Sequence, residues 1–296
     1  MKLYPQCAAA LLGLAAVPAL AVEDGKFADF GGVKIHYIDR GQGEPIVLLH
    51  GGTSSLESWV STGVVANLQK DFRVIAFDAR GAGKSDKPRD PKAYGRQQAL
   101  DVPRLLDALK LERAHIVGFS LGASTVAQLL TLNPERFLTA TQAAGAGRSP
   151  EAANDPRIEV EAAEIEKGCI SRSRLYRQAP PNAKPTEDDY RNAEARCRAD
   201  KTFDQYSVSA SLRGYRDQAV TPEQMQAVKV PTLGIVGTLD HTLKEMHELK
   251  RLRPEMKFVL LEGVSHTGAI RRPELVTELR AFIAARARPL SGANPG

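Results

Sequence analysis

The sequence has little that would hold a metal ion or bind a nucleic acid. It contains no His-Glu-x-x-His motif, no close cluster of cysteines and histidines, and no motif for an electron-carrying cofactor. Its 40 Lys and Arg residues only slightly outnumber its 35 Asp and Glu residues, which gives a formal net charge of +5. So small a surplus gives no basis for a nucleic-acid partner. We therefore expect no metal, no organic cofactor and no nucleic-acid binding.

Long hydrophobic runs are scarce beyond the first 21 residues. Residues 1–21 combine Lys2, an apolar stretch over 8–17 and the small-residue pattern Ala19-Leu20-Ala21, which is typical of a signal peptide. The stretch is short for a bilayer span, and no later segment is hydrophobic enough to cross one. We expect cleavage after Ala21, a periplasmic or secreted protein, and no stable membrane insertion. Loss of Lys2 would lower the charge from +5 to +4. The alternative is a buried N-terminal helix.

Cysteine is also rare, with three residues in the chain. Cys7 would leave with the signal peptide, so Cys169 and Cys197 would remain. An even number of cysteines in an oxidising compartment favours a disulfide between them. The bridge would close a loop of 28 residues and stabilise the fold by about 3 kcal/mol. Two unpaired thiols are the alternative.

Short apolar runs alternate with helical patterns over residues 22–147 and 229–288. This order is typical of a doubly wound α/β domain with a mostly parallel sheet. The runs that indicate strands are 33–38, 46–49, 72–77, 114–117, 138–143, 232–236 and 258–261. The helical patterns lie at 97–110, 123–132, 242–251 and 273–285. We expect these two stretches to form one core, followed by a flexible tail at 289–296.

The alternation breaks over residues 148–228, where the chain is charged and rich in helical patterns. We interpret this segment as a helical cap inserted into the core. The apolar residues expected to seat it and to line a pocket are Ile158, Ile165, Leu175, Tyr176, Tyr190, Phe203, Tyr206, Leu212 and Tyr215. Its arginines Arg172, Arg174, Arg191, Arg196 and Arg198 could suit an acidic substrate, although a solvated helical face is the favoured interpretation.

The pentapeptide Gly118-Phe119-Ser120-Leu121-Gly122 lies between an apolar run and a helical pattern. A serine at such a strand–turn–helix elbow projects its hydroxyl away from the backbone. The flanking glycines are expected to permit a strained backbone and a close approach of strand and helix. The pattern therefore indicates Ser120 as a nucleophile.

A serine nucleophile needs a base and an acid that orients the base. His266 follows the last expected strand and Asp240 follows the penultimate one, so both should reach the carboxyl edge of the sheet. The order Ser120, Asp240, His266 is the one that this type of elbow uses. Capping of the next helix is the alternative role for Asp240. We expect His115, His241 and His247 on the surface or in packing.

Backbone amides should stabilise the oxyanion that forms during acyl transfer. The Leu121 amide lies at the start of the elbow helix, where unpaired N–H groups favour an anion. The second donor is expected from Gly52, in the segment His50-Gly51-Gly52-Thr53. The alternative is that these glycines only permit a tight turn.

Together these motifs resemble the α/β-hydrolase fold, in the cap-bearing branch that holds esterases, carbon–carbon hydrolases, lactonases and perhydrolases. The resemblance covers residues 26–288 and includes His50-Gly51, Trp59 and the loop 78–85. It implies an eight-stranded sheet and a structural loop at 78–85, in which Asp78 and Arg80 are expected to pair. A serine nucleophile argues against the dehalogenase and epoxide hydrolase branches, which use a carboxylate.

The expected function is hydrolysis of a small carboxylic ester through an acyl-enzyme intermediate. Carbon–carbon bond hydrolysis, lactone opening, amide cleavage and perhydrolysis would use the same triad, because neither fold nor triad sets the substrate. An acyltransferase is a further alternative. A ligand-binding protein with a vestigial triad is an alternative of a different class.

Overall fold

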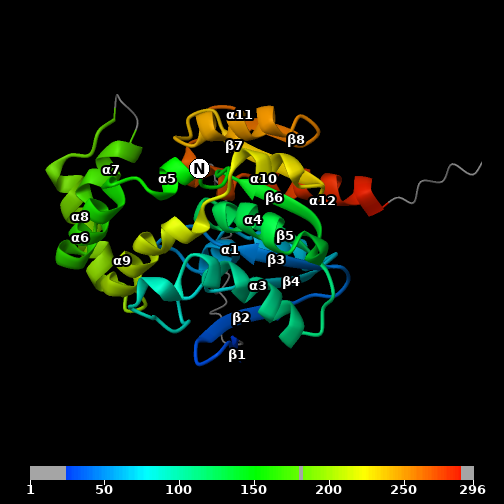
Figure 1. The fold of residues 1–296 in the computed structure, drawn as a ribbon, viewed down its shortest axis with the longest axis horizontal. Coiled ribbons are helices and arrows are strands. Elements are labelled where there is room, and N and C mark those ends of the chain that lie inside the picture. Colours follow the sequence, from blue (N-terminus) through cyan, green and yellow to red (C-terminus); the bar gives the residue numbers. More distant parts are fainter. Residues whose placement is uncertain (1–24, 180–182, 288–296) are drawn as a thin grey trace, which may run out of the picture.

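The computed structural model describes residues 25–179 and 183–287, and an eight-stranded sheet forms its centre. The strand order is β1-β2-β4-β3-β5-β6-β7-β8 (Figure 1). β1 and β2 are antiparallel, β2 is antiparallel to β4, and the neighbouring strands from β4 to β8 run parallel. The expected mostly parallel sheet is confirmed. The expected signal peptide at 1–21 and tail at 289–296 lie outside the described residues.

The observed elements follow the expected ones closely. The strands are β1 (Lys26–Asp29), β2 (Lys34–Arg40), β3 (Pro45–Leu49), β4 (Arg73–Phe77), β5 (Ala114–Phe119), β6 (Phe137–Ala143), β7 (Thr232–Gly237) and β8 (Lys257–Leu261). The helices of the core are α1 (Glu57–Ser61), α2 (Val64–Leu68), α3 (Arg96–Ala108), α4 (Leu121–Leu132), α11 (Leu243–Leu252) and α12 (Pro273–Ala287). β1 has no counterpart among the expected strands, because it is an edge strand of four residues with a largely exposed surface.

Helices cover both faces of the sheet, and each face has its own hydrophobic core. On one face, α3, α4 and α11 pack on strand residues such as Val47, Ile75 and Ile116. On the other, α1, α2 and α12 pack on residues such as Leu48 and Val74. Burial on both faces explains why the central strands are near-continuous apolar runs.

The segment between β6 and β7 contains the remaining helices. They are α5 (Pro150–Ala153), α6 (Arg157–Gly168), α7 (Arg172–Gln178), α8 (Glu187–Ala199), α9 (Gln205–Arg213) and α10 (Pro222–Ala227). α6 to α9 lie together beside the sheet (Figure 1), and we call these four helices the cap. α10 instead contributes Met225 to a core of the sheet.

The cap has a small core of its own. Ala162, Ile165, Leu212 and Tyr215 are buried together, and Leu121 of the sheet domain packs against them. Three of the apolar residues expected to seat the cap are instead exposed, namely Leu175, Tyr176 and Tyr206. The reason is that α7 and the start of α9 turn these side chains away from the small core.

Most of the arginines singled out in the cap belong to its solvated surface. Arg172, Arg191 and Arg198 form exposed ion pairs with Glu187, Asp188 and Glu194. Exposed pairs of this kind contribute little to stability. Arg174 differs, because it lines two cavities that are described below.

A disulfide joins Cys169 at the end of α6 to Cys197 in α8, with the two Cα atoms 6.3 Å apart. It links the two ends of a segment with little buried apolar surface. The bridge therefore compensates for a weak core in this half of the cap. None of the helices within the described residues has the length and apolar character that a bilayer crossing requires.

Replacing both cysteines by serine should lower the free energy of unfolding by about 3 kcal/mol, because the 28-residue loop would no longer be closed in the unfolded chain. Urea denaturation of the wild type and the double variant measures the difference. Dithiothreitol should destabilise the wild type and leave the double variant unchanged. Two reactive thiols in the denatured, unreduced protein would contradict the bridge.

Candidate active site

The elbow around Ser120 is a sharp turn at the carboxyl edge of the sheet. Ser120 joins β5 to α4 with φ at 54° and ψ at −112°. Its N–H donates to the Ala143 carbonyl at 2.9 Å, which fixes the turn to β6. The expected backbone strain is present, but the serine carries it, since neither Gly118 nor Gly122 has a positive φ. Strain of this kind costs about 1–3 kcal/mol and persists only where the surroundings enforce it.

The flanking glycines permit the close approach of strand and helix. A Cβ on Gly118 would lie 2.3 Å from the Gly122 carbonyl carbon and oxygen. A Cβ on Gly122 would lie 2.3 Å from the Leu49 carbonyl oxygen of β3. Any side chain at either position would push α4 away from the sheet and move Ser120.

The structure brings Ser120, His266 and Asp240 into one chain of hydrogen bonds. Ser120 Oγ lies 2.9 Å from His266 Nε2. His266 Nδ1 lies 2.9 and 3.0 Å from the two carboxylate oxygens of Asp240. Since an ionised carboxylate only accepts, Nδ1 carries the ring proton and Nε2 is free to accept the serine proton.

Asp240 is held ionised by its surroundings. Its buried side chain accepts hydrogen bonds from the amide and the hydroxyl of Thr242, at 2.8 and 2.9 Å. Burial alone would raise the pKa of Asp240, but the hydrogen bonds from His266 and Thr242 outweigh burial and lower the pKa below its usual value. Thr242 is the N-cap residue of α11, so Asp240 holds the turn before the helix and does not itself cap the helix.

The loops that carry Asp240 and His266 are pressed against each other. A Cβ on Gly237, at the end of β7, would lie 2.0 Å from the Val264 carbonyl oxygen. The Leu239 amide donates to that same carbonyl at 3.0 Å. Asp240 follows Gly237 by three residues, and His266 follows Val264 by two. This contact therefore sets the distance between the acid and the base.

His241 lies beside the triad, although its helical pattern predicts only a surface or packing position. Its ring centroid is 4.3 Å from that of His266, and its Nδ1 is 3.6 Å from Asp240 Oδ1. Desolvation and then repulsion by His266 lower the pKa of His241 to about 4, so its ring is neutral at neutral pH. Its position directly after Asp240 was the only sequence signal.

Asp240, His241 and His266 each offer a possible metal ligand, and these ligand atoms lie within 4.8 Å of one another. Both ring nitrogens of His266 already have hydrogen-bond partners in Ser120 and Asp240. A metal bound through His266 would therefore have to displace one of these bonds.

The two residues expected to supply the oxyanion donors, Gly52 and Leu121, lie next to each other. A Cβ on Gly52 would lie 3.7 and 3.8 Å from atoms of the Leu121 side chain. Leu121 is the first residue of α4, so its N–H has no acceptor within the helix. The Gly52 carbonyl accepts from the Thr53 hydroxyl at 2.7 Å, and Thr53 itself has φ at 54°. A strained residue beside the turn is consistent with a loop held in a fixed orientation.

His50 anchors this loop to the neighbouring one. Burial lowers the pKa of His50, so the ring is neutral. Its Nδ1 lies 2.7 Å from the Gly51 carbonyl, and its Nε2 accepts from the Ala79 amide at 3.0 Å. The ring therefore fixes the loop after β3 against the loop after β4.

The predicted pairing of Asp78 with Arg80 is wrong. Asp78 accepts from the Leu56 and Lys84 amides, at 2.7 and 2.8 Å, and lies 2.8 Å from His36 Nδ1. Arg80 binds Asp101 of α3 instead, through bonds of 2.7 and 2.5 Å. The two side chains do not pair because each is buried against a different part of the structure.

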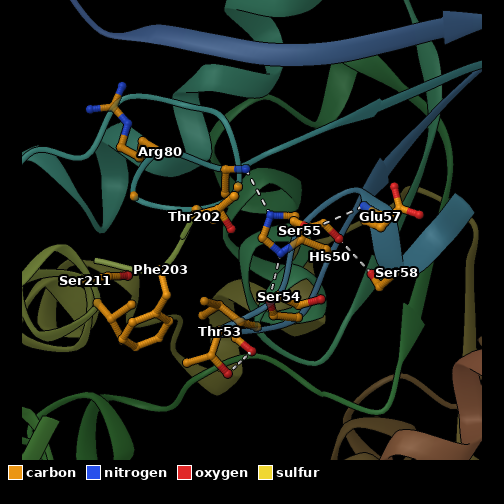
Figure 2. Close-up of a pocket in the computed structure, with 18 of the residues that line it drawn as sticks. His50, Thr53, Ser54, Ser55, Glu57, Ser58, Arg80, Thr202, Phe203 and Ser211 are labelled. Carbon is orange, nitrogen blue, oxygen red and sulfur yellow. Dashed lines mark hydrogen bonds between the residues drawn. The ribbon is translucent and has the colours of Figure 1, made fainter. Parts of the chain in front are cut away.

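Two cavities meet at the elbow beneath the cap. The first, which we call the nucleophile cavity, has a volume of about 270 Å³ and is lined by Ser120, His241 and residues 144–148, among others. The second, the serine-rich cavity, measures about 330 Å³ and lies along residues 50–58. In Figure 2, Ser55 and Ser58 face Phe203 and Ser211 of the cap across it. Leu121, Arg174 and Tyr215 line both cavities.

Comparison with known proteins supports the fold that the structure shows. Residues 44–164 match the family model described as the alpha/beta hydrolase fold. The chain therefore has the alpha/beta hydrolase fold. The solved enol-lactonase from Burkholderia xenovorans LB400 has 26% sequence identity and a TM-score of 0.71, over 88% of this chain and all of that one.

Several curated relatives are named as hydrolases of dienoic acids. The 2-hydroxy-6-oxo-6-phenylhexa-2,4-dienoate hydrolase of Comamonas testosteroni is 36% identical over 37% of this chain and 39% of its own. The 2-hydroxy-6-oxo-6-(2'-aminophenyl)hexa-2,4-dienoic acid hydrolase of Metapseudomonas resinovorans is 25% identical over 84% of this chain and 87% of its own. The alignments span 30 to 39% of the length of the first three curated relatives.

Gly122→Ala should destabilise the fold by about 1–3 kcal/mol or more, because its Cβ would clash with the Leu49 carbonyl, which is backbone and cannot rotate away. Gly168→Ala is the matched control, since a Cβ there meets nothing within 4 Å. Denaturant melts of both variants give the comparison. Equal stability of the two would show that α4 does not need this contact.

Proposed function

We propose that the protein is a serine hydrolase that cleaves a small carboxylic ester through an acyl-enzyme intermediate. The observation that carries the proposal is the continuous hydrogen-bond chain from Asp240 through His266 to the strained Ser120. An orienting acid, a neutral base and a serine at a helix N-terminus are the components that acyl transfer requires.

The first half-reaction forms the acyl-enzyme. As Ser120 Oγ attacks the carbonyl carbon, its proton passes to His266 Nε2 and the carbonyl electron pair moves onto oxygen. The Gly52 and Leu121 amides donate to that oxyanion, and Asp240 stabilises the imidazolium. Collapse of the tetrahedral intermediate breaks the ester bond, and the leaving alcohol takes its proton from His266.

The second half-reaction repeats these steps with water. His266 removes a proton from water as the hydroxyl adds to the acyl carbon, and the oxyanion forms at the same amides. Breakdown of this intermediate releases the carboxylic acid, and Ser120 recovers its proton from His266. The two half-reactions together consume only the ester and one water molecule, and they release the alcohol and the carboxylic acid.

Lactone opening and carbon–carbon bond hydrolysis are the second candidate. The names of the relatives favour them, since they include an enol-lactonase and dienoate hydrolases. A lactone is a cyclic ester, so the same two half-reactions open it, and the alcohol stays attached to the product. Assays with simple lactones beside linear esters separate the two substrate classes.

Ser120→Ala should lower kcat for short p-nitrophenyl esters by at least about 10⁴-fold, because loss of the nucleophile removes the covalent route. Release of p-nitrophenol measures the rate, and circular dichroism checks that the fold survives. Undiminished turnover would refute Ser120 as the nucleophile. If the wild type neither hydrolyses esters nor reacts with a fluorophosphonate, a ligand-binding protein is favoured. If added alcohols yield new ester products, an acyltransferase is favoured.

His50→Ala should lower kcat about tenfold with little change in KM. The ring fixes the loop that carries the Gly52 amide, and that amide acts most strongly in the transition state. Steady-state kinetics on a neutral ester measure the split between kcat and KM. His247→Ala, at an exposed position of α11, is the control. A change confined to KM would argue against a positioning role for His50.

We also propose a periplasmic or secreted location. The support is the disulfide between Cys169 and Cys197, which is typical of oxidising compartments. Fractionation of expressing cells, with sequencing of the mature N-terminus, tests this location.

A further inference from the structure

The nucleophile cavity contains more arginine than its own carboxylates neutralise. Within the described residues its charged lining consists of Arg148, Arg157, Arg174, Arg177, Asp155, Glu161 and Glu245. Two of the arginines have partners, since Arg157 pairs with Asp155 and Arg177 with Glu161. Arg148 and Arg174 form no ion pair with any described residue. Two unneutralised cations therefore line the cavity that contains Ser120, and Glu245 is the one acidic side chain left there.

Arg148 is held in place without an anionic partner. Its guanidinium stacks on the Tyr215 ring, 3.7 Å from the ring centroid, and its buried Nε has no hydrogen-bond acceptor. Its backbone pairs with Ala219 in an isolated bridge. Burial, together with repulsion by Arg174 and Arg177, lowers the pKa of Arg148, although an arginine stays protonated at neutral pH. The cation is thus fixed in orientation before any ligand arrives.

Arg174 approaches the site from the cap. It lies in α7 and lines both cavities, and a Cβ on Gly52 would be 3.9 Å from its guanidinium nitrogen. The guanidinium therefore lies close to the expected oxyanion site. A ligand anchored at Ser120 could reach both arginines.

We propose that Arg148 and Arg174 form a subsite for a carboxylate, so that the substrate is an acidic ester or lactone carrying a carboxylate besides its reacting carbonyl. This inference rests on the proposed hydrolase function and names the substrate class of the same site. Guanidinium groups match carboxylates because they offer parallel N–H donors in a plane. A bound carboxylate would supply the partner that both cations lack and would hold the reacting carbonyl near Ser120.

The test compares anionic and neutral esters of similar length. In the first pair the carboxylate is in the acyl half, so mono-p-nitrophenyl adipate is compared with neutral p-nitrophenyl valerate. In the second pair the carboxylate is in the alcohol half, so 4-acetoxybenzoate is compared with its neutral methyl ester. For at least one pair the wild type should prefer the acid in kcat/KM, after correction for spontaneous hydrolysis. Added salt should weaken the preference.

Arg148→Met and Arg174→Met should each reduce the ratio of acid to neutral kcat/KM about ten- to a hundredfold, the effect of losing a charged hydrogen bond. Arg174→Lys should restore part of the preference. Arg191→Met, which removes an exposed arginine of α8, is the matched control and should keep the wild-type ratio. Thermal melts confirm that each variant is folded.

A second readout does not depend on turnover. Sodium adipate should bind to Ser120→Ala in calorimetry and bind at least tenfold more weakly once Arg174→Met is added. If adipate binding depends on Arg174 but the wild type hydrolyses no ester, the proposed function is overturned and the subsite stands. Ester turnover by the wild type with no preference for the acid in either pair would overturn the subsite and leave the hydrolase function standing. Equal losses of kcat/KM on acid and neutral esters in the two arginine variants would have the same meaning.

Discussion

The close contact between α4 and β3 is the constraint on which the active site depends. Gly122 leaves room for α4 to lie directly against the Leu49 carbonyl, and Gly118 leaves room for the first turn of the helix. That approach forces Ser120 into its strained conformation and brings the Leu121 side chain beside Gly52. The conformation of Ser120, and the position of the residues proposed to bind the oxyanion, are therefore consequences of one packing contact.

A second set of contacts fixes the loops around the elbow. His50 joins the loop after β3 to the Ala79 amide, and Asp78 ties the loop after β4 to His36. Arg80 then anchors that loop to Asp101 in α3. These bonds are largely buried, where a missing partner costs more free energy than a bond contributes. The network therefore keeps the loop after β3 in one orientation.

The sequence predicts the residues whose positions depend only on the strand order. Asp240 and His266 each follow a strand of a parallel sheet, and the carboxyl ends of such strands meet at one edge. The partner of Arg80 was predicted wrongly, because Asp101 lies within α3 and approaches only when α3 packs on the sheet. The location of His241 depends likewise on the turn after β7. Contacts set by tertiary packing carry no local sequence pattern.

Strain and charge divide the molecule into two functional parts. The sheet domain supplies the reacting groups through tight glycine contacts, which tolerate little change in shape. Much of the cap surface carries exposed ion pairs that contribute little to stability, and one disulfide links α6 to α8, so side chains on that surface can change without disturbing the elbow. Arg174 is in the cap, whereas Arg148 follows β6 of the sheet domain. A carboxylate bound between them would therefore join the two parts and couple the choice of substrate to the position of the cap.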